Sequence, residues 1–140
     1  MAAQLQLREP QMNADEHRRK TNDTTHRIIG CAYTVSNTLG CGFLEKVYEN
    51  ALALELRKQG LAVQQQYPID VTYDGQVVGQ YVTDMLVEES VLIELKSMKM
   101  IEDIHIAQCL NYLAATKLQV CLLLNFDSPK LEVRRLVRDF

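Results

Sequence analysis

The sequence predicts one α/β domain in which a mixed central β-sheet is flanked by α-helices. Two segments with apolar residues at helical spacing come first, and a β region with a hairpin signal at Asp74-Gly75 follows them. Near the end, two apolar segments typical of buried strands are separated by a stretch with helical spacing. A β-meander joined through a crossover helix to a further strand predicts a mixed sheet with helices on both faces. A chain of 140 residues is long enough to bury a core as one domain.

The first 22 residues are polar and irregular, so we expect residues 1–22 to form a flexible tail. The run His17-Arg18-Arg19-Lys20 has two interpretations: a solvated part of that tail, or an arm that touches a nucleic-acid backbone. Asn22 and Asp23 are suitable N-cap residues, so the folded domain is expected to cover residues 23–140.

Two helices are expected before the β region. The first carries apolar residues at helical spacing from Ile28 to Leu39 and ends at Gly40. The second is expected over about residues 43–59. Its predicted apolar face contains Leu44, Val47, Ala51 and Leu54, with Tyr48 at the edge.

The β region is predicted to contain a weak first strand, a second strand opened by Pro68, and a return strand with a break at Gly79. A turn at Glu88-Glu89-Ser90 leads into an apolar strand of the kind found in the middle of a sheet. The expected elements are strands over about residues 61–66, 69–73, 76–87, 91–96, 118–126 and 131–137, and a helix over about residues 102–116.

Composition narrows the function classes. No apolar run approaches the roughly 18 residues of a membrane span, and the N-terminus lacks the apolar core of a signal peptide, so a cytoplasmic protein without a membrane partner is expected. The net charge of −3 does not favour non-specific DNA binding, because such binding depends on Lys and Arg side chains that neutralise phosphates. The four cysteines show no zinc-ligand spacing and are expected to be reduced thiols.

Glu94 and Lys96 are the first candidate site residues. Residues two apart in a strand point to the same face, so both charges project together from a strongly apolar strand. Buried ions are costly unless they are paired or bound to metal. An ion pair on an exposed sheet face is the alternative interpretation, because a Glu-x-Lys pattern alone is common.

Asp84 favours a metal site over a simple ion pair. It lies in the preceding, otherwise apolar strand, and the short turn at residues 88–90 brings it beside Glu94. Two close carboxylates repel each other unless a cation lies between them, and oxygen ligands suit Mg²⁺ or Mn²⁺. With Lys96 beside them to orient water or stabilise charge on a phosphate, these residues fit metal-assisted phosphodiester hydrolysis.

The predicted helices add polar candidates. His105, Gln108 and Tyr112 share one helix face, which either is solvated or lines the site. A separate apolar face of Ile106, Leu110 and Leu113 is expected to pack on the sheet. Tyr112 is a candidate for stacking on a base.

Several motifs together resemble the GxxExxY family. The segment Gly42-Phe43-Leu44-Glu45-Lys46-Val47-Tyr48 matches its signature literally. Further similarity lies in Tyr73-Asp74-Gly75, Tyr81 to Val87, Ile93 to Lys96, Gln108-x-x-x-Tyr112 and Leu122 to Phe126, over about residues 23–137.

The resemblance implies a PD-(D/E)XK nuclease with a restriction-endonuclease-like core. Asp84, Glu94 and Lys96 match the two signature acids and the lysine, and Glu45 matches a helix glutamate that often completes the metal environment. Gln108 and Tyr112 match a QxxxY motif found near the active site in the exonuclease-like branch. The chain departs from the family with Thr83 at the proline position, Ser36 in place of His, Cys41 in place of Pro and Asp127 in place of Gly.

Two function classes remain from the sequence. The first is a Mg²⁺- or Mn²⁺-dependent nuclease whose expected substrate is DNA, with RNA or a nucleotide as the other substrates that the same chemistry serves. The second is a non-catalytic nucleic-acid-binding or regulatory module that keeps the nuclease core and works with a protein partner or as a homo-oligomer. Small size and acidic balance favour the second class.

Overall fold

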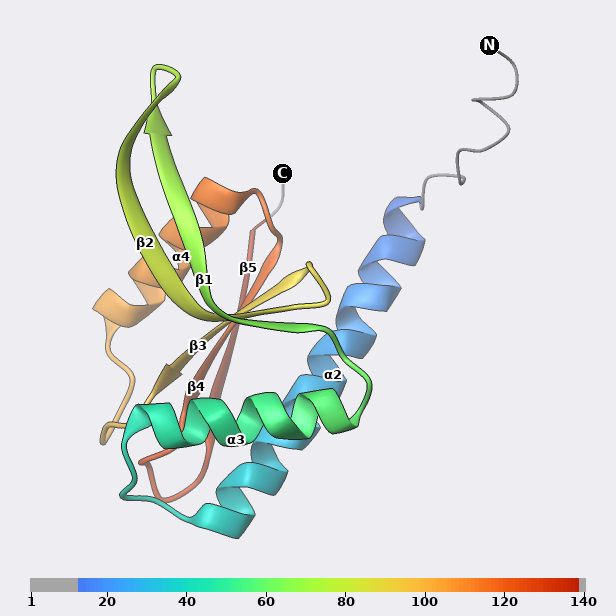
Figure 1. Ribbon diagram of the computed structural model, residues 1–140, viewed down its shortest axis with the longest axis vertical. Coiled ribbons are helices and arrows are strands. Elements are labelled where there is room, and N and C mark those ends of the chain that lie inside the picture. Colours follow the sequence, from blue (N-terminus) through green and yellow to red (C-terminus); the bar gives the residue numbers. More distant parts are fainter. Residues whose placement is uncertain (1–12, 139–140) are drawn as a thin grey trace.

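The computed structural model describes residues 13–138, in which five strands form one sheet in the order β1-β2-β3-β4-β5. β3 and β4 are parallel, because the crossover helix α4 connects them, and the other neighbouring pairs are antiparallel. Helices α2 and α3 cover one face and α4 covers the other, which confirms the predicted mixed sheet with helices on both faces (Figure 1). The elements are α2 (Ala14–Leu39), α3 (Glu45–Lys58), β1 (Val63–Tyr73), β2 (Gln76–Val87), β3 (Val91–Lys96), α4 (Asp103–Thr116), β4 (Val120–Asn125) and β5 (Glu132–Val137).

Each face of the sheet buries its own apolar core. Val91, Ile93 and Leu95 of β3 belong to the core under α2 and α3, whereas Leu92 belongs to the core under α4. Because side chains alternate along a strand, Glu94 and Lys96 project on the α4 side. The strand that carries the candidate acid and lysine is therefore fixed from both faces by buried apolar contacts.

The first helix begins earlier than the sequence predicted. Asn13 is the N-cap, its side chain accepts a hydrogen bond from Glu16 N at 2.8 Å, and α2 runs from Ala14 through the position expected to start it. The interpretation of residues 13–22 as irregular tail is thus wrong, because a local cap and buried Thr21, Thr24 and Thr25 extend the helix towards the N-terminus. Residues 1–12 of the expected tail lie outside the described residues.

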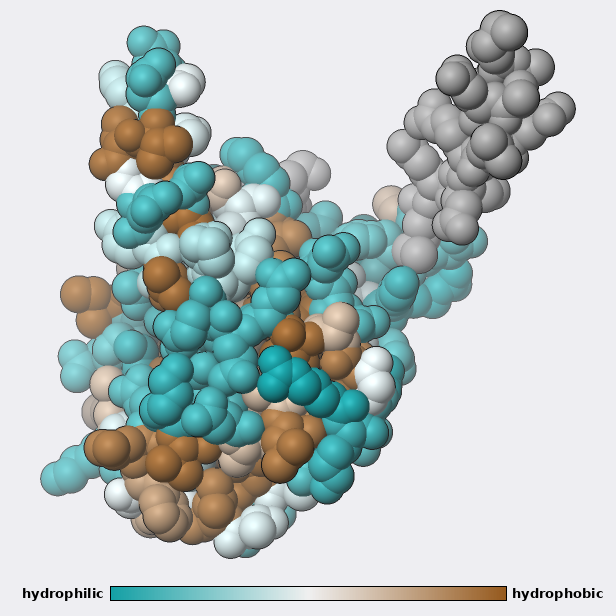
Figure 2. All heavy atoms as spheres, in the orientation of Figure 1, coloured by the Kyte–Doolittle hydropathy of each residue, from teal (hydrophilic) through white to brown (hydrophobic). Residues whose placement is uncertain are grey.

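The buried face of α3 also differs from the prediction. Leu44, Val47 and Leu54, expected to pack inward, are exposed, Leu44 to 79%. Figure 2 shows apolar surface over this helix. The side chains that pack on the sheet are instead Tyr48, Glu49, Leu52, Ala53 and Leu56. Both sets have helical spacing, so periodicity alone could not choose between them.

The hairpin is longer than expected, and its irregularities lie at Gln66, which has a positive φ of 56°, and between Val71 and Thr72, where the pairing register shifts. β1 is one continuous strand, and Pro68 is tolerated within it because β1 is an edge strand that needs ladder bonds on one side only. Asp74 and Gly75 both have positive φ, 52° and 76°, which confirms the predicted hairpin turn. The break expected at Gly79 is a shift in pairing register next to its partner Val71.

The other expected elements are present, with ends that differ by one or two residues. The described cysteines are free thiols, and all except Cys41 are buried. Within residues 13–138, the structure contains no helix with the length and apolar character needed to cross a membrane.

Tyr48 fixes the loop between α2 and α3. Its ring is fully buried and stacks on Phe126 with 4.7 Å between the ring centroids. Its hydroxyl donates to the Gly40 carbonyl oxygen at 2.6 Å and accepts from Phe43 N at 3.3 Å. The loop also receives support from Asp127, whose Oδ1 accepts from Gly42 N at 2.8 Å. The Gly42–Tyr48 segment is thus a clamp that sets where α3 begins.

We expect Tyr48→Phe to lower the free energy of unfolding by about 1–3 kcal/mol, because it leaves a carbonyl and an amide of this loop without their partner. Urea denaturation would measure the change. Tyr33→Phe, on the exposed side of α2, is the control and should alter stability by less than about 0.5 kcal/mol. Equal stabilities of Tyr48→Phe and the wild type would contradict the clamp.

Candidate functional site

The β2–β3 ladder ends where the two candidate acids lie. Backbone pairing joins Met85 to Ile93, and Asp84 and Glu94 come next in the same register. There, each carboxylate accepts a hydrogen bond from the opposite strand: Asp84 Oδ2 from Leu95 N at 2.7 Å, and Glu94 Oε1 from Asp84 N at 3.3 Å. The two carboxylates thus accept from backbone N–H groups where the strand ladder would supply carbonyl acceptors. These two hydrogen bonds bring the two carboxyl groups together.

Burial strongly perturbs Glu94. Glu94 is only 7% exposed, and this desolvation, followed by the charge and the side-chain hydrogen bond of Asp84, raises the pKa of Glu94 from 4.5 to about 8. The Lys96 ammonium acts in the opposite direction and lowers that pKa. Two carboxyl groups held in this way are stable together when they share a proton or when a cation neutralises them.

The Thr83 side chain contacts the Glu94 carboxylate. The Thr83 side chain is fully buried, and its hydroxyl lies 3.1 Å from the Ile93 carbonyl oxygen and 3.2 Å from Glu94 Oε1. It can donate its one hydrogen to either acceptor. A proline at this position, as the sequence resemblance would expect, has no such hydroxyl, so this chain holds Glu94 with a contact of its own.

Lys96 is half-buried at the end of β3, on the same face as Glu94. Its carbonyl oxygen accepts from Phe126 N at 2.9 Å, which closes the parallel ladder with β4. The loop that follows is held by the buried Asn125, whose amide donates to Met98 O at 2.8 Å and accepts from Met98 N at 3.0 Å. The strand end that carries Lys96 is therefore fixed by its hydrogen bond to β4 and by the hydrogen bonds of Asn125 to the following loop.

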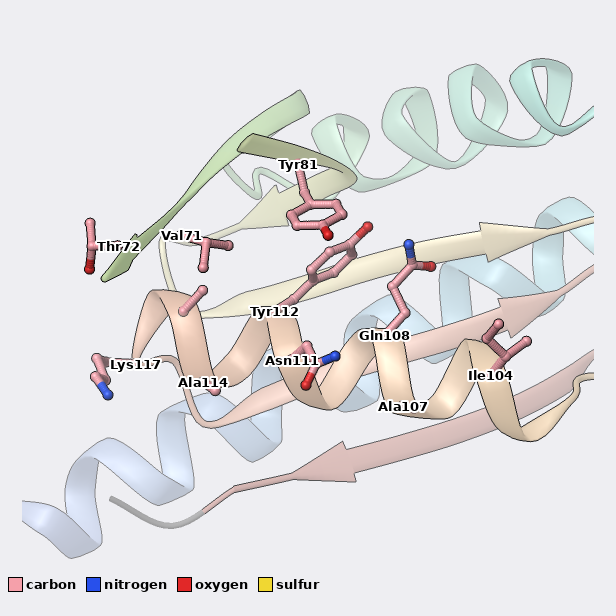
Figure 3. Close-up of a pocket in the computed structure, with 11 residues that line it drawn as sticks. Val71, Thr72, Tyr81, Ile104, Ala107, Gln108, Asn111, Tyr112, Ala114 and Lys117 are labelled. Atoms are coloured by element: carbon pink, nitrogen blue, oxygen red, sulfur yellow. The ribbon is translucent and has the colours of Figure 1, made fainter. Parts of the chain in front are cut away.

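Helix α4 brings Tyr112 to the acids. Tyr112 is 4% exposed, and burial, followed by the charges of Glu94 and other nearby groups including Asp84, raises the pKa of its hydroxyl. Its ring lies 5.8 Å from the ring of Tyr81 on β2, and Figure 3 shows the two rings one above the other. Tyr112, the candidate for stacking on a base, is therefore buried, whereas its neighbour Tyr81 is 51% exposed.

The other two members of the predicted polar face of α4 have different surroundings. Gln108 is half-buried, lines a groove beside Tyr112, and makes no side-chain hydrogen bond within residues 13–138. His105 belongs to a capping box at the start of the helix, where its Nδ1 accepts from Glu102 N at 3.1 Å. The apolar face expected to pack on the sheet contributes Leu113 fully, and Ile106 and Leu110 only in part.

Glu45 lies at the first turn of α3 and is exposed. The clamp brings this helix end to the end of β3, because Ser97 Oγ donates to Phe43 O at 3.0 Å. No described contact joins the Glu45 carboxylate to Asp84 or Glu94. Among residues 13–138, no group of three or more His, Cys, Asp or Glu side chains is arranged to hold a metal ion.

The sequence profile of the PD-(D/E)XK nuclease superfamily matches residues 22–136. The chain belongs to this superfamily. A search of curated proteins finds no match.

Among solved structures, this PD-(D/E)XK chain is similar to an alkaline exonuclease, LHK-Exo, from Laribacter hongkongensis. The TM-score is 0.50 and the identity 22%, over 67% of this chain and 56% of the exonuclease, so the chain spans little more than half of that protein's length. The likeness supports the fold, which is restriction-endonuclease-like.

Sequence reasoning missed several buried or contacting residues around the candidate site. Thr83 and Asn125 are polar residues in apolar strands, and that pattern was a usable signal for buried hydrogen-bonding roles. Glu49 is buried on α3, where it bonds to Lys46, Gln65 and Gln66; a helical position one turn after Glu45 was its only signal. The contact between Tyr81 and Tyr112 had no signal in the sequence, because it depends on tertiary structure.

The raised pKa of Glu94 predicts a pH dependence of stability in metal-free protein. The protonated group is favoured by folding, so its contribution is fully present below pH 4.5 and is lost as the pH rises through about 8, by about 1.4 kcal/mol per unit between these values. We expect Glu94→Gln to remove this slope when unfolding is measured in EDTA across that range.

Glu89→Gln, an exposed position in the adjacent turn, is the matched control and should keep the wild-type slope. The same slope in Glu94→Gln and the wild type would show that Glu94 is not held in this environment.

Proposed function

We propose that the chain is a metal-dependent nuclease that hydrolyses phosphodiester bonds in nucleic acid, with DNA as its substrate. The observation that carries the proposal is the pair of reciprocal hydrogen bonds in which the Asp84 and Glu94 carboxylates each accept from a backbone N–H of the opposite strand. These bonds hold Asp84 against the buried Glu94, with Lys96 on the same face of β3. Superfamily membership supports the same reaction class.

The donor set fits Mg²⁺ or Mn²⁺. Asp84 and Glu94 offer carboxylate oxygens, which hard cations prefer, and two carboxylates completed by water and substrate are a usual set for Mg²⁺. The raised pKa of Glu94 supports this fit, because the pair lacks a positive charge that compensates it fully. Bound metal would supply charge at the scissile phosphate and lower the pKa of a water. Glu45, from the clamp end of α3, is proposed as a further ligand reached through rotation of its exposed side chain.

The site residues, including the two proposed metal ligands, also act on the substrate and water. Asp84 and Glu94 orient the attacking water by accepting its hydrogen bonds. The Lys96 ammonium stabilises the negative charge that develops on the phosphate and helps to position that water. Gln108 offers its amide to the substrate from α4, and Tyr112 on the same helix bounds the acid pair with a buried ring.

We further propose that the chain belongs to the GxxExxY branch and acts in the cytoplasm. The literal Gly42–Tyr48 signature supports the first assignment, and the clamp gives this segment a physical role. The nuclease domain is proposed to cover residues 23–140, together with the N-terminal turns of α2 that pack ahead of it.

A non-catalytic nucleic-acid-binding or regulatory module is the second candidate. Two observations favour it: the net charge is −3, and residues 13–138 contain no preformed cluster of three metal-binding side chains. In this case a protein partner or a second copy of the chain would supply the grip on the nucleic acid.

Cleavage assays separate the two candidates. We expect the wild type to cut DNA with Mg²⁺ or Mn²⁺, and Glu94→Ala and Lys96→Ala to lower the rate by about 10²-fold or more. Lys99→Ala, exposed just beyond the strand, is the matched control and should retain activity. Equal cleavage by the wild type and Lys96→Ala would reject the proposed site. A wild type whose Tm does not change with Mn²⁺ and that cuts neither DNA nor RNA would favour the second candidate.

Thr83 gives a more specific test of the metal environment. Thr83→Val removes the hydroxyl next to Glu94 Oε1 at nearly constant shape, so we expect Mn²⁺ affinity to fall by about 10- to 100-fold, as for other residues that orient a ligand. Thr83→Ser keeps the hydroxyl and should bind as the wild type does. Calorimetric titration measures both, and equal affinities of Thr83→Val and Thr83→Ser would contradict this role.

A further inference from the structure

A groove of about 570 Å³ runs between α4 and the β1–β2 hairpin (Figure 3). Its volume lies within the range of small-molecule binding pockets, roughly 300–1,000 Å³. The hairpin contributes Val71 and Tyr81 to one wall, and α4 contributes Gln108, Asn111 and Tyr112 to the other. Small alanine side chains of α4 leave space between the walls.

Two residues link the groove to the acid pair: Tyr112 on α4 and Tyr81 on β2. Tyr112 lines the groove, and the charges of Glu94 and Asp84 act on the Tyr112 hydroxyl. Tyr81 precedes Asp84 by three residues in the same strand, a distance of about 10 Å along the chain. This spacing along the strand separates a group held beside Tyr81 from the acids by about the length of one to two nucleotides.

The chemistry of the walls fits a flat, uncharged group with polar edges. Lys117 is the one charged residue among the described residues that line the groove, so the groove is poorly suited to neutralising a phosphate backbone. The Tyr81 ring is 51% exposed and offers an aromatic face. The amides of Gln108 and Asn111 make no side-chain hydrogen bond within residues 13–138 and can donate to or accept from a base edge.

We propose that this groove binds an unpaired nucleobase near the scissile phosphate, with Tyr81 as the stacking residue. The substrate is then single-stranded DNA or a duplex end with an unpaired strand, because a base inside a duplex is stacked and must be extruded to enter. This inference rests on the proposed nuclease function and defines its substrate class.

The test measures binding without cleavage. In the Glu94→Gln background, which lacks a proposed metal ligand, fluorescence anisotropy gives the Kd of a labelled DNA strand and of the same sequence as a blunt duplex. We expect the single strand to bind at least about tenfold more tightly. Adding Tyr81→Ala should raise the single-strand Kd by about 5- to 150-fold, the loss expected for one stacked base.

The controls are chosen from the same hairpin. Tyr73 is 75% exposed, lies at the hairpin tip and does not line the groove, so Tyr73→Ala should change the Kd by less than about twofold. Tyr81→Leu keeps an apolar contact with Tyr112 but lacks an aromatic face, so it should also weaken binding, whereas Tyr81→Trp should preserve it. These two variants decide the test if Tyr81→Ala does not fold.

Other results would overturn the inference. Equal affinities for single strand and blunt duplex, or equal effects of Tyr81→Ala and Tyr73→Ala, would remove the groove from substrate binding. If Tyr81→Ala changes the sedimentation of the chain and leaves the DNA affinity unchanged, the groove is covered by a second copy instead. Wild-type cleavage of a blunt duplex as fast as of a single strand would overturn this inference while supporting the nuclease. A chain that binds single strands through Tyr81 and cuts nothing would support the groove and overturn the nuclease.

Discussion

The local divergence of β2 from β3 is the constraint on which the rest of this site depends. Two neighbouring strands cannot separate inside a packed sheet without leaving backbone groups unpaired, and buried unpaired groups are costly. Here the carboxylates of Asp84 and Glu94 take the place of the missing carbonyl acceptors. The acids are thus held by the same hydrogen bonds that let the strands part. Removing either acid would leave a backbone amide without its acceptor, so structure and chemistry are tied at this point.

Much of the fold followed from local patterns, and its errors have physical causes. The hairpin at Asp74-Gly75 and the crossover through α4 depend on turn chemistry and chain order, which the sequence states directly. The predicted buried face of α3 was wrong. That helix carries two apolar stripes, and only its packing against the rest of the fold decides which stripe is buried. The predicted start of α2 was wrong because Asn13 and Asn22 are both suitable N-cap residues. The residue type alone does not tell which of the two caps the helix.

The candidate site divides in the same way. Strand alternation placed Glu94 and Lys96 on one face, and a short turn placed Asp84 beside them, so these three could be predicted from local geometry. The contact between Tyr81 and Tyr112 joins residues from a hairpin and a helix that are distant in sequence, and no spacing rule anticipates it. Spacing alone left open whether His105 is solvated or lines the site, and the structure places its side chain in the capping box at the start of α4.

Strand β2 of the long hairpin has two parts that pair differently. Residues Met85 to Val87 of β2 pair with β3 and fix Asp84, whereas the part before Asp84 pairs with β1 alone and carries Tyr81. Because a hairpin keeps its facing when it changes by two residues on each strand, its tip at Asp74-Gly75 can grow or shrink in such steps without moving the acids. Evolutionary or engineered change at this tip can therefore reshape the surface near Tyr81 while the proposed reactive centre keeps its position.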